Sequence, residues 1–262
     1  ADRGGRKMKN LLIILTLFLQ PNNVEKTEKL LYQNMVHHSS PRGVKSAVYS
    51  SLMVQVLGHD SLGSLGTGNL IKIEEIDIDL SGSSIDILFK DATVVLTAQH
   101  VIDKASELVV IERNGNIIPA SVIYEDKNKD IAALVLHSDP TITEAIRFKQ
   151  RKDNKIGKEV YHCGHPSIIP FNLSRGVITS FQENHIVTDS FSLPGSSGSV
   201  VFGKSGDSIG IVVSVGFDQH FGVPELIEEV VRVSLLDYLD IQGIVEALEN
   251  EQTRIESRND NN

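Results

Sequence analysis

The sequence predicts an all-β protein of two antiparallel six-stranded barrels with a C-terminal α-helix. The first observation is a series of short alternating or β-branched runs, separated by turn residues, that begins at Ala47. The second is the charged stretch Lys149–Lys155, after which a new series of such runs begins. The third is an apolar pattern of helical spacing from Pro224 to Glu249. Two groups of short strands favour two barrels over alternating strand–helix units.

The expected strands follow one another closely, and Asn114-Gly115 between two of them is a hairpin signal. The first group comprises Val48–Leu57, Asn69–Ile73, Ile85–Phe89, Thr93–Thr97, Leu108–Glu112, Ile117–Tyr124 and Ile131–Leu136; the second comprises Glu159–Cys163, Gly176–Phe181, His185–Thr188, Ser199–Phe202 and Ile209–Val215. The expected segments are an N-terminal apolar segment at 1–21, a linker at 22–45, barrels at 46–145 and 146–222, a helix at 223–250 and a disordered tail at 251–262.

The composition excludes several classes of function. With 262 residues and 40% hydrophobic content the chain is long enough for one large or two small cores. Its formal net charge of -9 argues against a general nucleic-acid binder. Cys163 is the only cysteine, which excludes an intrachain disulfide and a cysteine-rich metal site. The close histidine pairs, His37/His38 and His162/His165, lack ligand spacing, so we expect solvated or structural roles, and no metal or cofactor.

The N-terminal region leaves two interpretations open. Lys7–Asn10 is basic and precedes the apolar run Leu11–Leu19, which is too short to span a membrane but has the size of a signal-peptide core. No small-residue cleavage site follows in Gln20–Asn23. The segment is either an export or anchor signal, with membrane contact through 11–19, or a helix packed on the domain or a partner. The first predicts a secreted, periplasmic or membrane-associated protein; the second leaves a cytoplasmic or virion location open.

A glycine- and serine-rich turn around Ser197 is the most informative stretch for function. It lies between an alternating segment and the strand-like run Val200–Phe202. Glycines let the backbone turn tightly, so that its N–H groups face a developing oxyanion beside a nucleophilic serine. His100 and Asp130 supply the base and orienting acid that such a serine needs, at strand ends 30 residues apart.

These segments resemble the chymotrypsin-like serine peptidases, and among them the disulfide-free HtrA/DegP type. Thr97-Ala-Gln-His-Val is similar to that family's Thr-Ala-x-His-Val, and Asp130-Ile-Ala-Ala-Leu to its Asp-Ile-Ala-Leu-Leu. Thr188-Asp-Ser-Phe-Ser-Leu-Pro-Gly-Ser-Ser-Gly-Ser resembles Thr-Asp-Ala-x-x-x-Pro-Gly-Asn-Ser-Gly-Gly. Gly66-Thr-Gly-Asn and Gly164-His-Pro, the latter with Ser174-Arg-Gly-Val-Ile-Thr-Ser, match further family segments.

The resemblance implies a trypsin-like fold and a catalytic triad. Ser197 would be the nucleophile, His100 the general base and then acid, and Asp130 the group that orients His100. The turn Gly195, Ser196 and Ser197 would form the oxyanion hole, with the N–H groups of Gly195 and Ser197 as donors. The family also implies that the C-terminal helix packs on the second barrel, with an oligomer or partner contact as the alternative.

Departures from the family pattern bear on activation and specificity. Ser196 replaces the aspartate that receives a freed N-terminus in digestive enzymes, so that zymogen switch is absent. Ser199 gives the Ser-Gly-Ser form seen in staphylococcal glutamyl endopeptidases. Phe191 occupies the position of trypsin's acidic pocket residue, which argues against cleavage after Lys or Arg. The expected pocket residues are Phe191, Ser192, Val212, Ser214 and Gly216.

The pocket positions favour a small or medium apolar side chain in the substrate. Val212 stands where glutamyl enzymes carry a histidine, so glutamate specificity is not supported, although His220 is near enough in sequence to reach the pocket. Asp189 matches the HtrA Asp of Thr-Asp-Ala and has no expected charge-reading role. We therefore expect a serine endopeptidase acting on protein or peptide substrates. The alternatives are a catalytically silent binding or assembly protein of the same fold, and a viral or phage maturation protease.

Overall fold

The structure is a computed structural model, and its contacts divide the chain into units at 1–38 and 39–262. The apolar segment at 11–19, the expected strand at 85–89 and the alternative pocket residue His220 lie outside the residues that the structure describes. Within the described part, no helix is long and apolar enough to cross a membrane. The described residues are 34–57, 64–73, 79–80, 83–84, 92–103, 105–149, 153–166, 169–182, 185–218 and 228–259.

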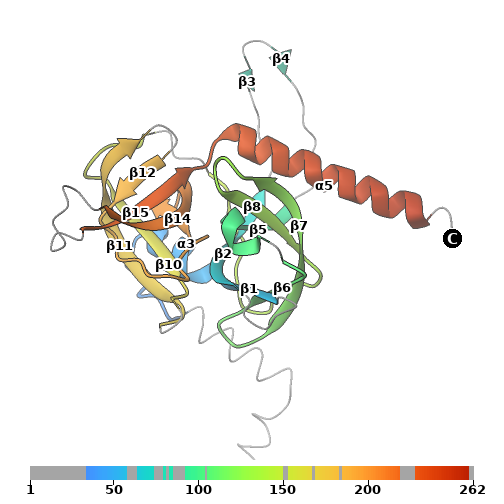
Figure 1. Cartoon of the computed structure of the whole chain (residues 1–262), viewed down its shortest axis with the longest axis horizontal. Coiled ribbons are helices and arrows are strands. Elements are labelled where there is room, and N and C mark those ends of the chain that lie inside the picture. Colours follow the sequence, from blue (N-terminus) through green and yellow to red (C-terminus); the bar gives the residue numbers. More distant parts are fainter. Residues whose placement is uncertain are drawn as a thin grey trace, which may run out of the picture. The chain divides into compact units, whose positions relative to one another are not determined.

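The first barrel is an antiparallel sheet in the order β1-β6-β7-β8-β5-β2, which the pairing of β1 with β2 closes (Figure 1). The short strand β9 adds to β2 in parallel, so this barrel extends past its expected end at residue 145. A separate two-stranded sheet joins β3 (Asp79–Leu80) and β4 (Ser83–Ser84). The barrel strands are β1 (Ser51–Leu57), β2 (Leu65–Ile73), β5 (Ala92–Thr97), β6 (Glu107–Ile111), β7 (Ile117–Asp126), β8 (Ile131–Leu136) and β9 (Ile146–Arg147).

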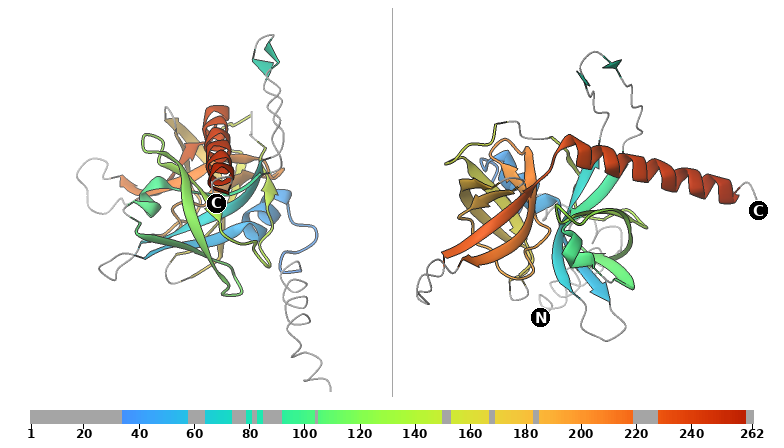
Figure 2. Two further views of the ribbon diagram at one scale, coloured as in Figure 1. Left: turned by 90° about the vertical axis from the view of Figure 1, so that its right-hand side faces the viewer. Right: turned by 45° about the horizontal axis from the view of Figure 1, so that its top comes forward.

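The second barrel is closed in the order β10-β11-β12-β15-β14-β13, and Figure 2 shows its strands curving around a common core. That core consists of β-branched aliphatic side chains, which suit a pleated and buried surface. Its members are Val160, Ile178, Ile186, Val201, Ile209, Val212, Val231 and Val233. The strands are β10 (Glu159–Gly164), β11 (Asn172–Gln182), β12 (His185–Thr188), β13 (Val200–Gly203), β14 (Ser208–Asp218) and β15 (Glu228–Leu235).

The predicted all-β class with two barrels and a C-terminal helix is confirmed, but three further boundaries were wrong. Helix α3 (Arg42–Tyr49) occupies the end of the expected linker and the start of the first expected strand. Strand β15 occupies the start of the expected helix, so the second barrel does not end at residue 222. Helix α5 (Tyr238–Asn259) starts later and continues through most of the expected disordered tail.

The misassigned strand has a physical explanation. Val231 and Val233 face the barrel core, but Ser234 is also fully buried and Leu235 is partly buried. A strand buried on both faces shows no simple alternation, and a short apolar run then fits a helical pattern equally well. Long-range pairing with β12 and β14 decides the outcome in favour of a strand.

Helices α3 and α5 pack on different barrels. Helix α3 packs on β10 and β13, where a Cβ at Gly43 would come 2.1 Å from the carbonyl oxygen of Gly203. Helix α5 packs on β7, so the prediction that it packs on the second barrel is wrong. A Cβ at Gly243 of α5 would lie 2.6 Å from the Tyr124 ring, and glycine therefore allows the close approach of helix and strand.

Candidate active site

His100 and Asp130 form a doubly hydrogen-bonded pair. His100 lies in the short helix α4 (Gln99–Ile102), directly after the buried end of β5, and Asp130 immediately precedes β8. The His100 Nδ1 lies 2.6 Å from Asp130 Oδ2, and the backbone N–H of His100 donates to Asp130 Oδ1 at 2.8 Å. One carboxylate thus orients both the ring and the backbone of the histidine, and the other ring nitrogen, Nε2, remains for a reacting group.

The turn that carries Ser197 presses against the strand end that leads into His100. Gly198 has a φ of 93°, and a Cβ there would lie 2.0 Å from the Thr67 carbonyl oxygen and 2.4 Å from Thr97 Oγ1. Only glycine combines this backbone conformation with so close an approach. The Ser197 carbonyl accepts the Thr67 N–H at 2.8 Å, and Gly198 donates to the Val212 carbonyl at 2.7 Å.

The three expected triad residues therefore lie on elements that touch one another. Gly66 shows this directly, because a Cβ there would meet Val101, next to His100, at 2.5 Å and the Ser197 carbonyl oxygen at 3.1 Å. Among the hydrogen bonds of the described residues, none joins the Ser197 hydroxyl to His100. Such bonds are often long in substrate-free sites and tighten when substrate binds.

The expected oxyanion turn is held in a single conformation by neighbouring groups. The Ser196 N–H donates to the Leu193 carbonyl at 2.9 Å, so this N–H is committed to the turn. Gly195 has a φ of 104°, and its carbonyl accepts the Thr67 hydroxyl at 2.7 Å. Of the three residues expected at the oxyanion hole, Gly195 and Ser197 therefore supply the candidate donors.

Thr67 is a supporting residue that sequence reasoning used only as part of a motif. Its side chain is fully buried, and its hydroxyl accepts the His165 N–H at 2.9 Å while donating to Gly195. A hydroxyl is needed because one atom must both accept and donate in this position. The motif Gly66-Thr-Gly indicated a close approach of backbones, but nothing in the sequence identified the partner of the hydroxyl.

The expected pocket residues divide into exposed and buried positions. The Phe191 side chain is 48% exposed, whereas Ser192 and Val212 are buried. Ser214 and Gly216 lie on β14, opposite Arg232 and Val230 of β15. The Asp189 carboxylate accepts the Val177 N–H at 2.6 Å, a structural contact that agrees with the expectation that it reads no substrate charge.

Both histidines of the 162/165 pair are buried. His165 is held by Ser51 Oγ at 2.9 Å from Nε2 and by the Phe171 N–H at 3.1 Å from Nδ1. The His162 ring lies next to the backbone of Phe191, whose hydrogen bond offsets only part of the effect of burial on the histidine pKa. Burial lowers the pKa of His162 to about 4 and that of His165 to about 3, so both rings are neutral at pH 7.

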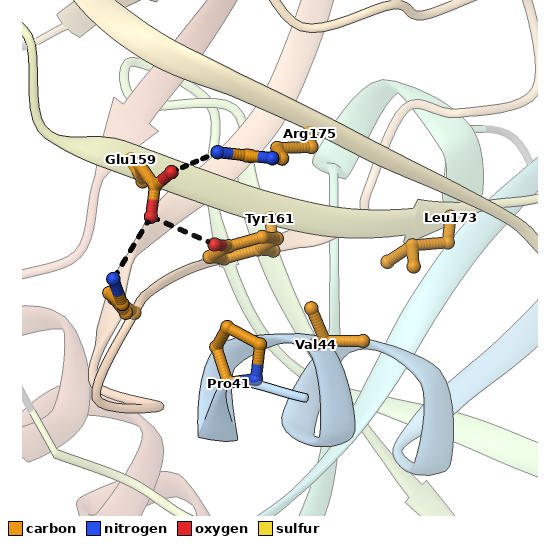
Figure 3. A pocket seen from close by; sticks show the side chains of 7 residues that line it. Pro41, Val44, Glu159, Tyr161, Leu173 and Arg175 are labelled. Atoms are coloured by element: carbon orange, nitrogen blue, oxygen red, sulfur yellow. Dashed lines mark hydrogen bonds and ion pairs between the residues drawn. The ribbon is translucent and has the colours of Figure 1, made fainter. Parts of the chain in front are cut away.

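A separate surface hollow of about 280 Å³ lies between α3 and strands β10 and β11 (Figure 3). Figure 3 shows Glu159 bonded to Arg175 and Tyr161, with Pro41 and Val44 on the helix side. None of the expected catalytic residues lines it. The hollow is therefore not the place where His100 would meet a substrate.

Comparison with known proteins agrees with the fold. A family model described as a trypsin-like peptidase domain matches residues 85–211. The serine endoprotease DegS of Haemophilus influenzae is 26% identical over 199 residues, which cover 69% of this chain and 57% of that protein. The Do-like serine protease HtrA of Bacillus subtilis is 26% identical over 149 residues, covering 50% and 33% respectively.

Two solved structures share the fold. The serine endoprotease of Yersinia pestis aligns with a TM-score of 0.55 at 21% identity, covering 76% of this chain and 63% of that one. The HtrA-type protease AlgW with tripeptide aligns with a TM-score of 0.58 at 18% identity, covering 77% and 60%. The chain thus spans less than two thirds of the length of these relatives. Over residues 85–211 it is similar to trypsin-like peptidase domains, and the relatives it matches are HtrA-type serine proteases.

Proposed function

We propose that the protein is a serine endopeptidase that hydrolyses peptide bonds through an acyl-enzyme on Ser197. One observation carries the proposal. His100 is hydrogen-bonded to Asp130 through Nδ1, and helix α4, which carries His100, lies against the glycine turn that bears Ser197. A lone histidine–aspartate pair would be an ordinary structural contact. Here the pair lies against a Gly-Ser-Ser-Gly turn whose two glycines, Gly195 and Gly198, have φ angles of 104° and 93°. This arrangement favours catalysis over a structural role.

The chemistry follows from the roles of these groups. The Ser197 oxygen attacks the carbonyl carbon of the scissile bond while His100 Nε2 takes the hydroxyl proton. The N–H groups of Gly195 and Ser197 stabilise the oxyanion that forms. His100 then gives its proton to the leaving amine, and water releases the acyl group by the same route. Asp130 keeps the tautomer with Nδ1–H and stabilises the cationic ring.

The proposed substrates are proteins or peptides with a small or medium apolar side chain before the cleaved bond. This rests on Phe191 in place of an acid and on the structural bond that occupies Asp189. His162, which is neutral and lies next to the Phe191 backbone, and buried Val212 bring no charge to the expected pocket. Profiling against a peptide library tests the specificity, and strong cleavage after Lys, Arg or Glu would contradict it.

A serine-directed fluorophosphonate probe and a casein-type substrate test the activity. We expect the probe to label Ser197 and Ser197→Ala to abolish both labelling and cleavage. Ser205→Ala, an exposed serine in the turn after β13, is the matched control and should retain both. Cleavage that survives Ser197→Ala would refute the proposed nucleophile. Absence of labelling in the folded protein would support a binding or assembly protein instead.

An extracytoplasmic location is the second part of the proposal. It is supported by the basic residues and apolar run at 7–19 and by a relative named as a probable periplasmic serine protease. Alkaline phosphatase fused after residue 45 reports location, because the reporter is active only in an oxidising compartment. An active fusion is expected, and an inactive but expressed one would argue for the cytoplasm.

A further inference from the structure

Asp130 adopts a backbone conformation that its surroundings must hold. Its φ is 57°, in the left-handed region, which most residues with a Cβ seldom occupy and aspartate occupies more often than most. It closes the turn between β7 and β8, and its carbonyl oxygen accepts the Gln99 N–H at 3.3 Å. A non-glycine residue in this region is strained and persists only where neighbouring contacts over-determine it. In this conformation the Asp130 carboxylate accepts hydrogen bonds from the ring and the backbone of His100.

The support comes from the residue next to it. The Lys129 ammonium lies 2.7 Å from Asp237 Oδ2 and 3.1 Å from both carboxylate oxygens of Asp240. We call these contacts the Lys129 bridge. The Lys129 side chain is 19% exposed and that of Asp240 is 2% exposed. Burial alone would lower the pKa of Lys129, but hydrogen bonds to the two carboxylates raise it above its usual value.

The far end of the Lys129 bridge is rigid. The Asp240 N–H donates to Asp237 Oδ1 at 3.0 Å, and the Asp237 N–H donates to Asp240 Oδ2 at 2.7 Å. This reciprocal pair caps the first turn of α5 in the manner of a capping box. The near end is rigid as well, because Asp126 Oδ1 accepts the N–H groups of Asn128 and Lys129 at 2.8 and 3.1 Å.

Helix α5 is itself fastened beside the bridge. The Tyr124 ring fits against Gly243, and Ile241, Ile244 and Val245 of the helix are buried. A chain of fixed contacts therefore runs from α5 through Lys129 to the turn that ends at Asp130. The two consecutive side chains bind different partners: Lys129 binds the start of α5, and Asp130 binds His100.

We propose that Lys129 is a positioning residue for the reaction, and that through the Lys129 bridge helix α5 holds Asp130 in its strained conformation against His100. Release of the ammonium would let the turn relax toward common backbone angles and rotate the carboxylate away from Nδ1. The inference rests on the proposed function for its effect on turnover. Its structural half, the dependence of the Asp130–His100 bond on Lys129, stands without it.

Lys129→Met tests the proposal because it keeps the length of the side chain and removes the charge. We expect kcat for a peptide substrate to fall about 10- to 100-fold with KM little changed, as misplacement of a catalytic group does. Lys129→Arg should restore most of kcat. Lys127→Met is the matched control, since Lys127 is an exposed lysine of the same turn, and its kcat should stay within about twofold of the wild type.

A second measurement separates this inference from the peptidase activity. The proton in the short Nδ1–H···Oδ2 bond should give a proton NMR resonance far downfield of ordinary amides. It should weaken or disappear in Lys129→Met and persist in Lys129→Arg and Lys127→Met. If the wild type shows no peptidase activity, the resonance alone decides the structural half.

A folded Lys129→Met protein with an unchanged resonance and kcat within twofold of the wild type refutes the proposal. Should that variant fail to fold, Asp237→Asn is used, because the Asp237 side chain is 42% exposed and Asp240 still pairs with Lys129. In Asp237→Asn we expect the intensity of the NMR resonance and kcat to fall by smaller factors than in Lys129→Met. If both stay unchanged, the result contradicts the role of α5.

Discussion

At the residue scale, the candidate site contains glycines and hydroxyl groups that no other residue type can replace at their positions. Gly198 must have a positive φ and must also lie against Thr67 and Thr97, whereas Gly115 has a similar φ of 85° with nothing near its missing Cβ. The contrast separates two costs of replacing a glycine. One is backbone strain, and the other is steric conflict with neighbouring backbone atoms.

Gly198→Ala should abolish fluorophosphonate labelling, because its Cβ would lie 2.0 Å from the Thr67 carbonyl oxygen and 2.4 Å from Thr97 Oγ1 and so force the Ser197 turn away from β2 and β5. Gly115→Ala should cost only about 1 kcal/mol of unfolding free energy and leave labelling intact. Thermal denaturation and probe labelling of both variants test this. Full labelling of Gly198→Ala would contradict the described packing of the turn.

Thr67→Val should lower kcat while leaving KM nearly unchanged. The substitution keeps the size of the side chain but leaves the His165 N–H and the Gly195 carbonyl without their shared partner. The loss should cost about 1–3 kcal/mol of stability. Thr93→Val, at an exposed threonine on β5, serves as the control and should change neither quantity. Steady-state kinetics and urea unfolding measure the two effects. If both variants behave alike, the Thr67 hydroxyl does not support the site as described.

At the element scale, most strands were well predicted, whereas β15 was mistaken for helix and the C-terminal helix was predicted with the wrong start and the wrong partner. The runs that became β5, β8 and β12 agree with the structure to within a residue, because each is a buried or alternating segment between clear turns. Helix α5 was expected on the wrong barrel, since a helical apolar stripe shows that a helix packs but not on what. The close approach at Gly243 decides its partner, β7.

The packing of α5 predicts a measurable coupling between Gly243 and Tyr124. Gly243→Ala would by helix propensity stabilise the protein by about 1 kcal/mol. Its Cβ, however, would lie 2.6 Å from the ring, so we expect a lower free energy of unfolding instead. In a Tyr124→Ala background the same change should be stabilising. A double-mutant cycle by urea unfolding measures the difference, and additive effects would show that the contact is absent.

At the scale of the whole molecule, buried neutral histidines make folding sensitive to acid. The pKa values of His162 and His165 in the folded state, about 4 and about 3, lie below the usual value of 6.5. The unfolded chain therefore binds more protons below pH 6.5, and the folded state loses stability as the pH falls from there toward 4. Above that range the two rings are neutral in both states and contribute no pH dependence.

Stability should fall by roughly 2 kcal/mol between pH 7.5 and pH 5 on account of His162 alone. His162→Leu, which fills a similar buried volume without a titrating group, should remove that share of the pH dependence. Urea unfolding at the two pH values measures it. An equally steep dependence in His162→Leu would mean that other groups carry the acid sensitivity.

The order of the motifs and the alternation of the strands were enough to predict the all-β class, the two barrels and His100, Asp130 and Ser197 as candidates. These properties are local, because a strand's period and a glycine turn are written in adjacent residues. Three features were decided only by the tertiary structure: the formation of strand β15, the packing of α5 on β7, and the Lys129 bridge to Asp237 and Asp240. Each depends on contacts between residues far apart in the chain, and the free energy of such contacts overrides the local preference of a segment.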